Sequence, residues 1–225
     1  MIKAVLLDVD NTLLDFNLNA AHSMKAAFSS CNLEYNDSFF DVFLEVNTDL
    51  WDKIERRQIT REELKRDRFK FILEKLGIKG DSAQLESLFR ENLGKFAFPV
   101  EGAMDMINYL EKKYRLFVAS NAIYKQQILR LTKSNMISHF EKLFISEKIG
   151  FDKPSKEYFN YCIENIGGVT AKEVAIIGDS LSADISGASA VGIITVWFNI
   201  HGKSAPNAPL ADYTITKLSQ IESIL

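Results

Sequence analysis

The chain has 225 residues, of which 47% are hydrophobic and 25% charged, and its formal net charge is −3. This composition is typical of a globular protein that buries its own core, and it excludes a general attraction to nucleic acid or to anionic membranes. No apolar run approaches the roughly 18 residues that cross a bilayer. The cysteines, Cys31 and Cys162, lack CxxC spacing. We therefore expect a cytoplasmic protein without disulfides.

The first hundred residues contain two different patterns. An apolar run over residues 2–7 ends at Asp8 and predicts a strand buried on both faces of a parallel sheet. Residues 16–96 instead show apolar positions at helical spacing, and Thr60 followed by Glu63 fits a capping box. Gly77 and Gly80 indicate helix ends. This stretch predicts an all-helical insert of about four helices.

From residue 97 onward, apolar strand runs alternate with helical patterns. The expected strands are 116–119, 143–145, 174–177, 193–198 and 213–215, the last followed by a terminal helix. The expected helices are 104–113, 125–133, 156–165 and 183–191, and a turn-rich loop is expected over 201–212. The alternation predicts an α/β fold with a doubly wound, mostly parallel sheet. Residues 1–15 and 97–225 would form this domain, with 16–96 inserted as a second one.

Two carboxylates follow the first strand. Because residues two apart in an extended chain point the same way, Asp8 and Asp10 can share one site. They repel each other unless a cation lies between them, and Mg²⁺ prefers oxygen ligands of this kind. An Asp/Asn-rich turn after a strand explains the same residues without any ligand.

Further polar residues follow the later strands. Ser120 and Asn121 offer a hydroxyl and backbone N–H groups for a phosphate oxygen, and Lys153 offers a point charge for a phosphoryl group. Asp179 adds a carboxylate at the same sheet edge, and Asp184 follows five residues later. Taken singly, each has an ordinary explanation as a helix cap or a surface lysine.

The order of these clusters resembles the four motifs of the haloacid dehalogenase (HAD) superfamily. The motifs are Asp8-x-Asp10-x-Thr12, Ser120-Asn121, Lys153-Pro154 and Gly178-Asp179 with Asp184. The resemblance covers the whole chain, and the helical insert is similar to the all-helical cap domain of this superfamily. It implies a HAD-like core of 1–15 and 97–225 with a cap of 16–96.

The resemblance also implies a mechanism. Asp8 would be the nucleophile that forms an aspartyl-phosphate, and Asp10 the general acid and base. The implied cofactor is Mg²⁺, held by Asp8, Asp10 (through its carbonyl) and Asp179. Asp184 would orient Lys153 or a metal-bound water. The implied phosphate-binding residues are Thr12, which also fixes the loop around Asp10, Ser120, Asn121 and Lys153.

The substrate class is implied by a looser resemblance to pyrimidine 5′-nucleotidases, carried by Phe16, Trp51 and Arg68 with their neighbours. The implied substrate is a nucleoside monophosphate, and the implied assembly is a monomer or a homodimer. Trp51 is more simply explained as a core aromatic of the helical insert, and Arg68 as part of a solvated face.

Alternative functions stay open. Within the superfamily they are a phosphatase for phosphoglycolate or a sugar phosphate, and a phosphoglucomutase-like enzyme. A receiver domain also uses an aspartate and a lysine at a sheet edge, but it has no insert of this size. A non-catalytic binding protein on the same scaffold would not need all four motifs.

Overall fold

The computed structural model describes residues 1–200, 202 and 211–225. The turn-rich loop expected over 201–212 lies largely outside these residues. The chain divides into two compact units, which we call the α/β unit (Met1–Phe16 with Ala97–Leu225) and the helical unit (Asn17–Phe96). The boundary falls one residue later than the expected division after residue 15.

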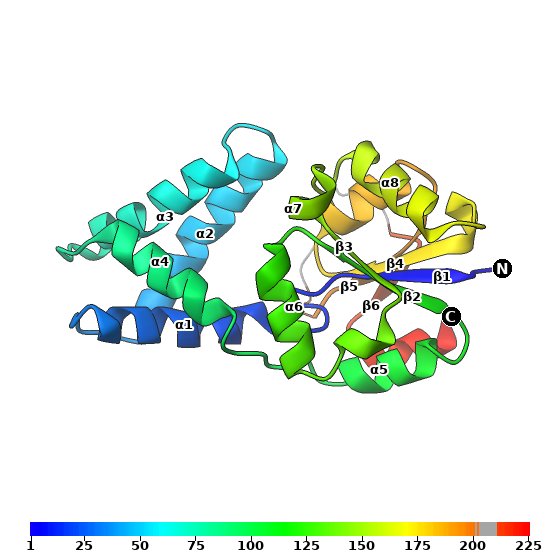
Figure 1. The fold of residues 1–225 in the computed structure, drawn as a ribbon, viewed down its shortest axis with the longest axis horizontal. Helices are drawn as coiled ribbons and strands as arrows, with labels where there is room; N and C mark the ends of the chain where they lie inside the picture. Colours follow the sequence, from blue (N-terminus) through cyan, green and yellow to red (C-terminus); the bar gives the residue numbers. More distant parts are fainter. Residues whose placement is uncertain (201, 203–210) are drawn as a thin grey trace. The chain divides into compact units, whose positions relative to one another are not determined.

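The α/β unit is built on a parallel sheet of six strands within the described residues, in the order β3-β2-β1-β4-β5-β6 (Figure 1). The strands are β1 (Ala4–Leu7), β2 (Arg115–Ser120), β3 (Lys142–Ile145), β4 (Val174–Gly178), β5 (Ile194–Phe198) and β6 (Tyr213–Ile215). The expected doubly wound sheet is thus confirmed. The strand order reverses between β1 and β4, which is where such sheets open a crevice for ligands.

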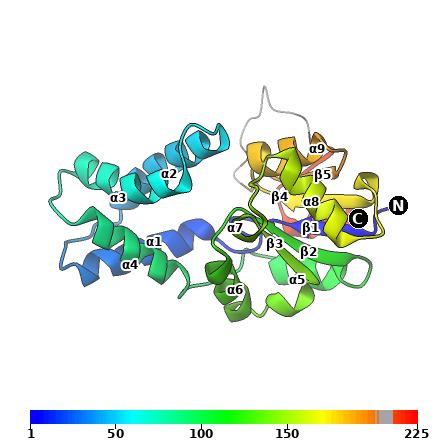
Figure 2. The same ribbon diagram turned by 45° about the horizontal axis from the view of Figure 1, so that its top comes forward.

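Helices cover both faces of this sheet (Figures 1 and 2). They are α5 (Ala103–Leu110), α6 (Tyr124–Lys133), α7 (Ser146–Ile149), α8 (Lys156–Ile166) and α9 (Gly187–Ser189). Val5 and Leu7 of β1 share a buried cluster with residues of α5 and α6, whereas Ala4 and Leu6 pack with residues of α8. Because both faces are covered, the strands read as unbroken apolar runs.

Two expected helices take another form. The segment expected as a helix over 183–191 is a π-helical segment, Leu181–Ser186, followed by the short α9. The carbonyl of Ser180 accepts from the N–H groups of both Asp184 and Ile185, at 3.0 and 3.2 Å, which widens the first turn. The terminal helix is a 3₁₀ helix over Leu218–Ser223. The helical pattern alone does not distinguish these tighter and wider turns.

The helical unit contains α1 (Phe16–Ser30), α2 (Phe39–Glu55), α3 (Arg61–Leu76) and α4 (Ser82–Leu93), with α1 beginning on the last residue of the α/β unit's first segment. The capping box at the start of α3 is confirmed: Thr60 Oγ1 accepts from Glu63 N–H at 3.2 Å, and Thr60 N–H donates to Glu63 Oε2 at 2.8 Å. Gly77 ends α3 with a φ of 66°, but Gly80 lies in the loop before α4. No helix in the described residues is long and apolar enough to span a membrane.

Arg68 is buried inside the helical unit. Its Nη2 and Nε donate to Glu86 at 2.6 and 3.0 Å, and its Nη1 donates to Asn47 Oδ1 at 3.0 Å. The guanidinium also lies 4.7 Å from the ring centroid of Phe89. The expectation that Arg68 contacts substrate is therefore corrected. Its hydrogen bonds hold α2, α3 and α4 together, and only 4% of the residue is exposed.

Candidate active site

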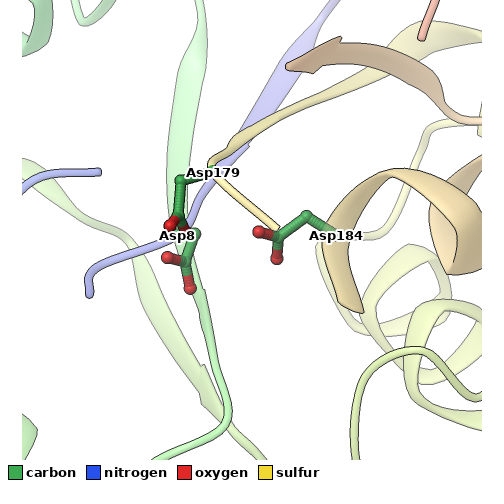
Figure 3. A group of neighbouring side chains, drawn as sticks. All are labelled: Asp8, Asp179 and Asp184. Carbon is green, nitrogen blue, oxygen red and sulfur yellow. The ribbon is translucent and has the colours of Figure 1, made fainter. Parts of the chain in front are cut away.

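Carboxylates gather at the carboxyl ends of β1 and β4, where the strand order reverses. Leu7 pairs with Ile177 in the parallel register, and Asp8 N–H donates to Ile177 O at 3.0 Å. This register brings Asp8 and Asp179 to the same edge. Asp184 reaches it from the π-helical segment, so that one carboxylate oxygen of each aspartate lies within 4.8 Å of the others (Figure 3).

Lys153 joins two of these carboxylates. Its buried Nζ donates to Asp8 Oδ1 at 2.7 Å, to Asp184 Oδ1 at 2.6 Å and to the carbonyl of Ala119 at 2.8 Å. An ammonium has three protons to donate, so these contacts use them all. The backbone before the cis Lys153–Pro154 bond is held by Asn121, whose Nδ2 donates to Lys153 O at 2.8 Å and whose Oδ1 accepts from Lys153 N–H at 2.9 Å. The side chain of Asn121 therefore positions Lys153.

The buried charges shift each other's pKa values. Burial raises the pKa of Asp8 to about 7, although Lys153 opposes the shift; the charges of Asp184 and Asp10 raise it further. Burial disfavours the ammonium of Lys153, but Asp184 and Asp8 outweigh burial and hold its pKa above the usual value. The lysine contacts the carboxylates of Asp8 and Asp184, and an oxygen of the third aspartate, Asp179, lies within 4.8 Å of theirs. A second cation would relieve this excess of negative charge.

A divalent metal matches this donor set. Asp8, Asp179 and Asp184 offer carboxylate oxygens, which hard cations such as Mg²⁺ prefer. Gly178 makes the approach of Asp184 possible, because a Cβ atom there would overlap the carboxylate of Asp184. The resemblance implied that Asp184 orients Lys153 or a metal-bound water and that Asp10 binds the metal through its carbonyl. In the structure the carboxylate of Asp184 contacts Lys153 and also belongs to the acidic cluster, so it is a further candidate ligand.

The carboxylate of Asp10 is held by α6. Arg130 Nη1 donates to Asp10 Oδ1 at 2.5 Å, and Gln127 Nε2 donates to Asp10 Oδ2 at 3.0 Å. The same Gln127 nitrogen lies 2.9 Å from Ser120 Oγ, which accepts from it. Sequence analysis missed Gln127 and Arg130. Polar residues in an amphipathic helix normally face solvent, yet here both are buried while Leu129 is 47% exposed.

The remaining candidates lie in separate places. Thr12 is buried in the loop after β1, and Asn11, with a φ of 62°, accepts from Phe16 N–H at 3.0 Å through its side chain. This hydrogen bond holds the backbone of half-buried Phe16 beside the first motif. Trp51 lies in α2 of the helical unit, partly exposed, with the Arg61 guanidinium 5.9 Å from its ring centroid.

A family model of haloacid dehalogenase-like hydrolases matches residues 2–192. The chain belongs to this family. The chain is 36% identical to a protein of Bacillus subtilis named as the HAD hydrolase YfnB. The alignment covers 99% of this chain and 95% of that protein. A crystal structure of YfnB bound to magnesium superposes with a TM-score of 0.94 at 35% identity, covering 100% of this chain and 98% of that one.

Two relatives carry more specific names. Pyrimidine 5′-nucleotidase PynA of Streptococcus pneumoniae is 30% identical, over 88% of this chain and 84% of its own length. Pyrimidine 5′-nucleotidase YjjG of Escherichia coli is 26% identical, over 98% of this chain and 96% of its own length. The resemblance to the HAD superfamily is thereby confirmed, and this chain is a hydrolase of that family.

Proposed function

We propose that this HAD hydrolase is a Mg²⁺-dependent phosphomonoesterase that works through an aspartyl-phosphate on Asp8. One observation carries the proposal. Asp8 lies at the reversal point of the sheet, hydrogen-bonded to Lys153 and within 4.8 Å of Asp179 and Asp184. This arrangement supports the roles that we propose: Asp8 as nucleophile, Lys153 as the phosphate-binding cation and the three carboxylates as metal ligands.

The first step transfers the phosphoryl group. A carboxylate oxygen of Asp8 attacks phosphorus while the bond to the leaving oxygen breaks, which produces an acyl phosphate. The positive charge of Lys153 and the hydroxyl group of Ser120 stabilise the phosphoryl oxygens. Because Ser120 Oγ already accepts from Gln127, its own proton is available to donate to such an oxygen. Bound Mg²⁺ would shield the charge of the nucleophile from that of the substrate.

Asp10 supplies the proton transfers. Its carboxyl group protonates the leaving alcohol in the first step, and its carboxylate then removes a proton from the water that hydrolyses the acyl phosphate. The second step releases inorganic phosphate and restores Asp8. Haloalkanoic acid dehalogenases of the same superfamily lack this second aspartate, so its presence favours a phosphatase.

The substrate we propose is a pyrimidine nucleoside monophosphate. The names of PynA and YjjG support this class. In this proposal the α/β unit is the catalytic core, the helical unit is the cap domain that selects substrate, and Phe16 and Trp51 are the candidate contacts to the nucleoside. A phosphatase for phosphoglycolate or a sugar phosphate, or a phosphoglucomutase-like enzyme, is the alternative.

A substrate panel tests the proposal. Phosphate release is measured with Mg²⁺ for pyrimidine and purine nucleoside monophosphates, sugar phosphates, phosphoglycolate and p-nitrophenyl phosphate. We expect the highest kcat/KM for pyrimidine nucleotides and no turnover in excess chelator. If phosphoglycolate or a sugar phosphate ranks first, the nucleotidase assignment is wrong. If no ester releases phosphate, the phosphatase assignment is wrong as well.

A further inference from the structure

Asp10 has both carboxylate oxygens engaged by one helix. Arg130 Nη1 occupies Oδ1, and Gln127 Nε2 occupies Oδ2. The two α6 side chains also bind each other, because Gln127 Oε1 accepts from Arg130 Nη1 at 2.9 Å. The result is a fixed bracket around the carboxylate, made by residues that belong to none of the four motifs.

The bracket extends to the phosphate-binding motif. Gln127 Nε2 donates both to Asp10 and to Ser120 Oγ, so a single amide links the acid/base carboxylate to the hydroxyl at the end of β2. The two residues lie 110 positions apart in the sequence, Asp10 in the loop that follows β1 and Ser120 at the end of β2. Their separation is therefore set by α6 as well as by the sheet.

Packing alone gives no reason for this chemistry. The side chain of Arg130 is 5% exposed, and that of Asp10 is 30% exposed. Burying a guanidinium carries a desolvation cost that apolar residues of similar volume avoid, so an ordinary core-facing helix position would be apolar. The neighbouring Leu131 is such a residue and is fully buried. The bracket thus has a cost in stability that its contact with Asp10 explains.

We propose that Arg130 and Gln127 are positioning residues that fix Asp10 relative to Ser120 for proton transfer to the leaving oxygen. This inference rests on the proposed phosphatase function. As the bond between phosphorus and the leaving oxygen breaks, the proton of Asp10 moves to that oxygen. The carboxylate that remains is stabilised by the Arg130 donor, which is already in place.

The proposal predicts a dependence on the leaving group. An alkyl alcohol leaves poorly unless it is protonated, whereas p-nitrophenolate leaves readily without a proton. Misplacing Asp10 should therefore slow the phosphorylation of Asp8 by alkyl esters far more than by p-nitrophenyl phosphate. A residue that only supports the fold would slow both reactions alike.

The experiment compares Arg130→Gln and Gln127→Leu with wild type. The substrates are p-nitrophenyl phosphate and the alkyl phosphate that wild type hydrolyses fastest in the panel above. Because Asp10 also activates water in the second step, p-nitrophenolate is followed in the first turnover. The alcohol released from the alkyl ester is followed in the first turnover as well. We expect its rate of release to fall on the order of 100-fold, and that of p-nitrophenolate to fall less than about tenfold.

Arg115→Gln is the matched control. Arg115 also forms an ion pair, with Glu141 at 2.7 Å. It begins β2, however, and so lies at the opposite end of that strand from Ser120. We expect this variant to keep the wild-type ratio of the two rates. Should Arg130→Gln fail to fold, Gln127→Leu leaves the Arg130–Asp10 pair intact and gives the same discrimination.

Equal losses on both esters in a folded variant, or wild-type rates on both, would overturn the positioning role and leave the phosphatase assignment standing. Absence of any phosphate release by wild type would instead overturn the phosphatase assignment. The two failures are therefore distinguishable.

Discussion

Each unit contains a buried ion network, and the two networks differ in their charge balance. In the helical unit, Arg68 and Glu86 form a bidentate pair, and Asn47 accepts a further hydrogen bond. In the α/β unit, the ammonium of Lys153 contacts the carboxylates of both Asp8 and Asp184. The first network matches one cation to one anion, whereas the second has more carboxylates than the lysine can neutralise.

This difference separates a structural network from a reactive one. Burial raises the pKa of both Glu86 and Asp8, and the cation beside each opposes the shift, but only Asp8 has further carboxylates, those of Asp184 and Asp10, that raise its pKa again. Asp8 keeps a pKa of about 7 even with Lys153 beside it. A carboxylate that is left so poorly stabilised is suited to bind a metal ion and to attack an electrophile. Substitutions in the network of the α/β unit should therefore lower activity, whereas substitutions in the network of the helical unit should lower stability.

The largest expected effect is on turnover, in the α/β unit. Asp8→Asn should lower kcat on the order of 10⁴-fold or more, because an amide cannot form the acyl phosphate. The measurement is phosphate release by protein freed of contaminating phosphatases. Asp105→Asn, an exposed substitution in α5, is the control and should keep wild-type activity. Retention of most activity by Asp8→Asn would contradict the mechanism.

The matching change in the helical unit should act on stability. Glu86→Gln leaves the buried guanidinium of Arg68 without its counterion, which typically costs about 3–5 kcal/mol. Chemical denaturation of the helical unit, followed by Trp51 fluorescence in a Trp197→Phe background, measures the loss. Glu45→Gln removes the partner of exposed Lys75 and should cost less than about 1 kcal/mol. Similar losses for the two variants would show that the Arg68 network is not structurally important.

A third effect is a pH dependence of the stability of the α/β unit, governed by Asp8. The pKa of Asp8 is raised from an ordinary value of 3.8 to about 7 in the fold, so between these values the folded state holds a proton that the unfolded state has lost. Stability must then fall as pH rises, by up to about 1.4 kcal/mol per pH unit. Glu173, whose ion pair with Lys3 lowers its pKa to about 2, is ionised in both states above about pH 6 and adds no slope there.

Denaturation between about pH 5 and 7, with Trp197 as the reporter in a Trp51→Phe background, checks this slope. Asp8→Asn should flatten it, and Mg²⁺ should do the same in the protein that retains Asp8 by stabilising the ionised carboxylate. Parallel curves with and without the Asp8→Asn substitution would show that burial of Asp8 does not control the slope.

The sequence predicts most of the sheet edge and much less of what surrounds it. Asp8 and Asp179 are found because each directly follows an apolar strand, and the parallel register then brings them together. Gln127 and Arg130 are not found, because a polar residue on a helix predicts solvent exposure. Their burial depends on Asp10, which is distant in sequence. The prediction for Arg68 was wrong for the same reason, since its partner Glu86 lies on another helix.

The smallest expected effect concerns Trp51. This side chain lies in α2, partly exposed and near the Arg61 guanidinium, so it is not a fully buried core aromatic. Stacking of an aromatic side chain on a base contributes about 1–3 kcal/mol in nucleic-acid binders, which corresponds to roughly one to two decades in kcat/KM. Trp51→Ala should lose that factor on pyrimidine nucleotides and lose less on p-nitrophenyl phosphate, which carries no base.

Phe40→Ala is the matched control for Trp51→Ala. Phe40 is a half-buried aromatic of the same helix, stacked on Phe43 at 5.4 Å between ring centroids. Its removal should lower the melting temperature while the ranking of substrates stays as in wild type. If Trp51→Ala behaves in the same way, Trp51 only packs the helical unit and selectivity arises elsewhere. A change in ranking without a change in melting temperature would instead assign substrate selection to the helical unit.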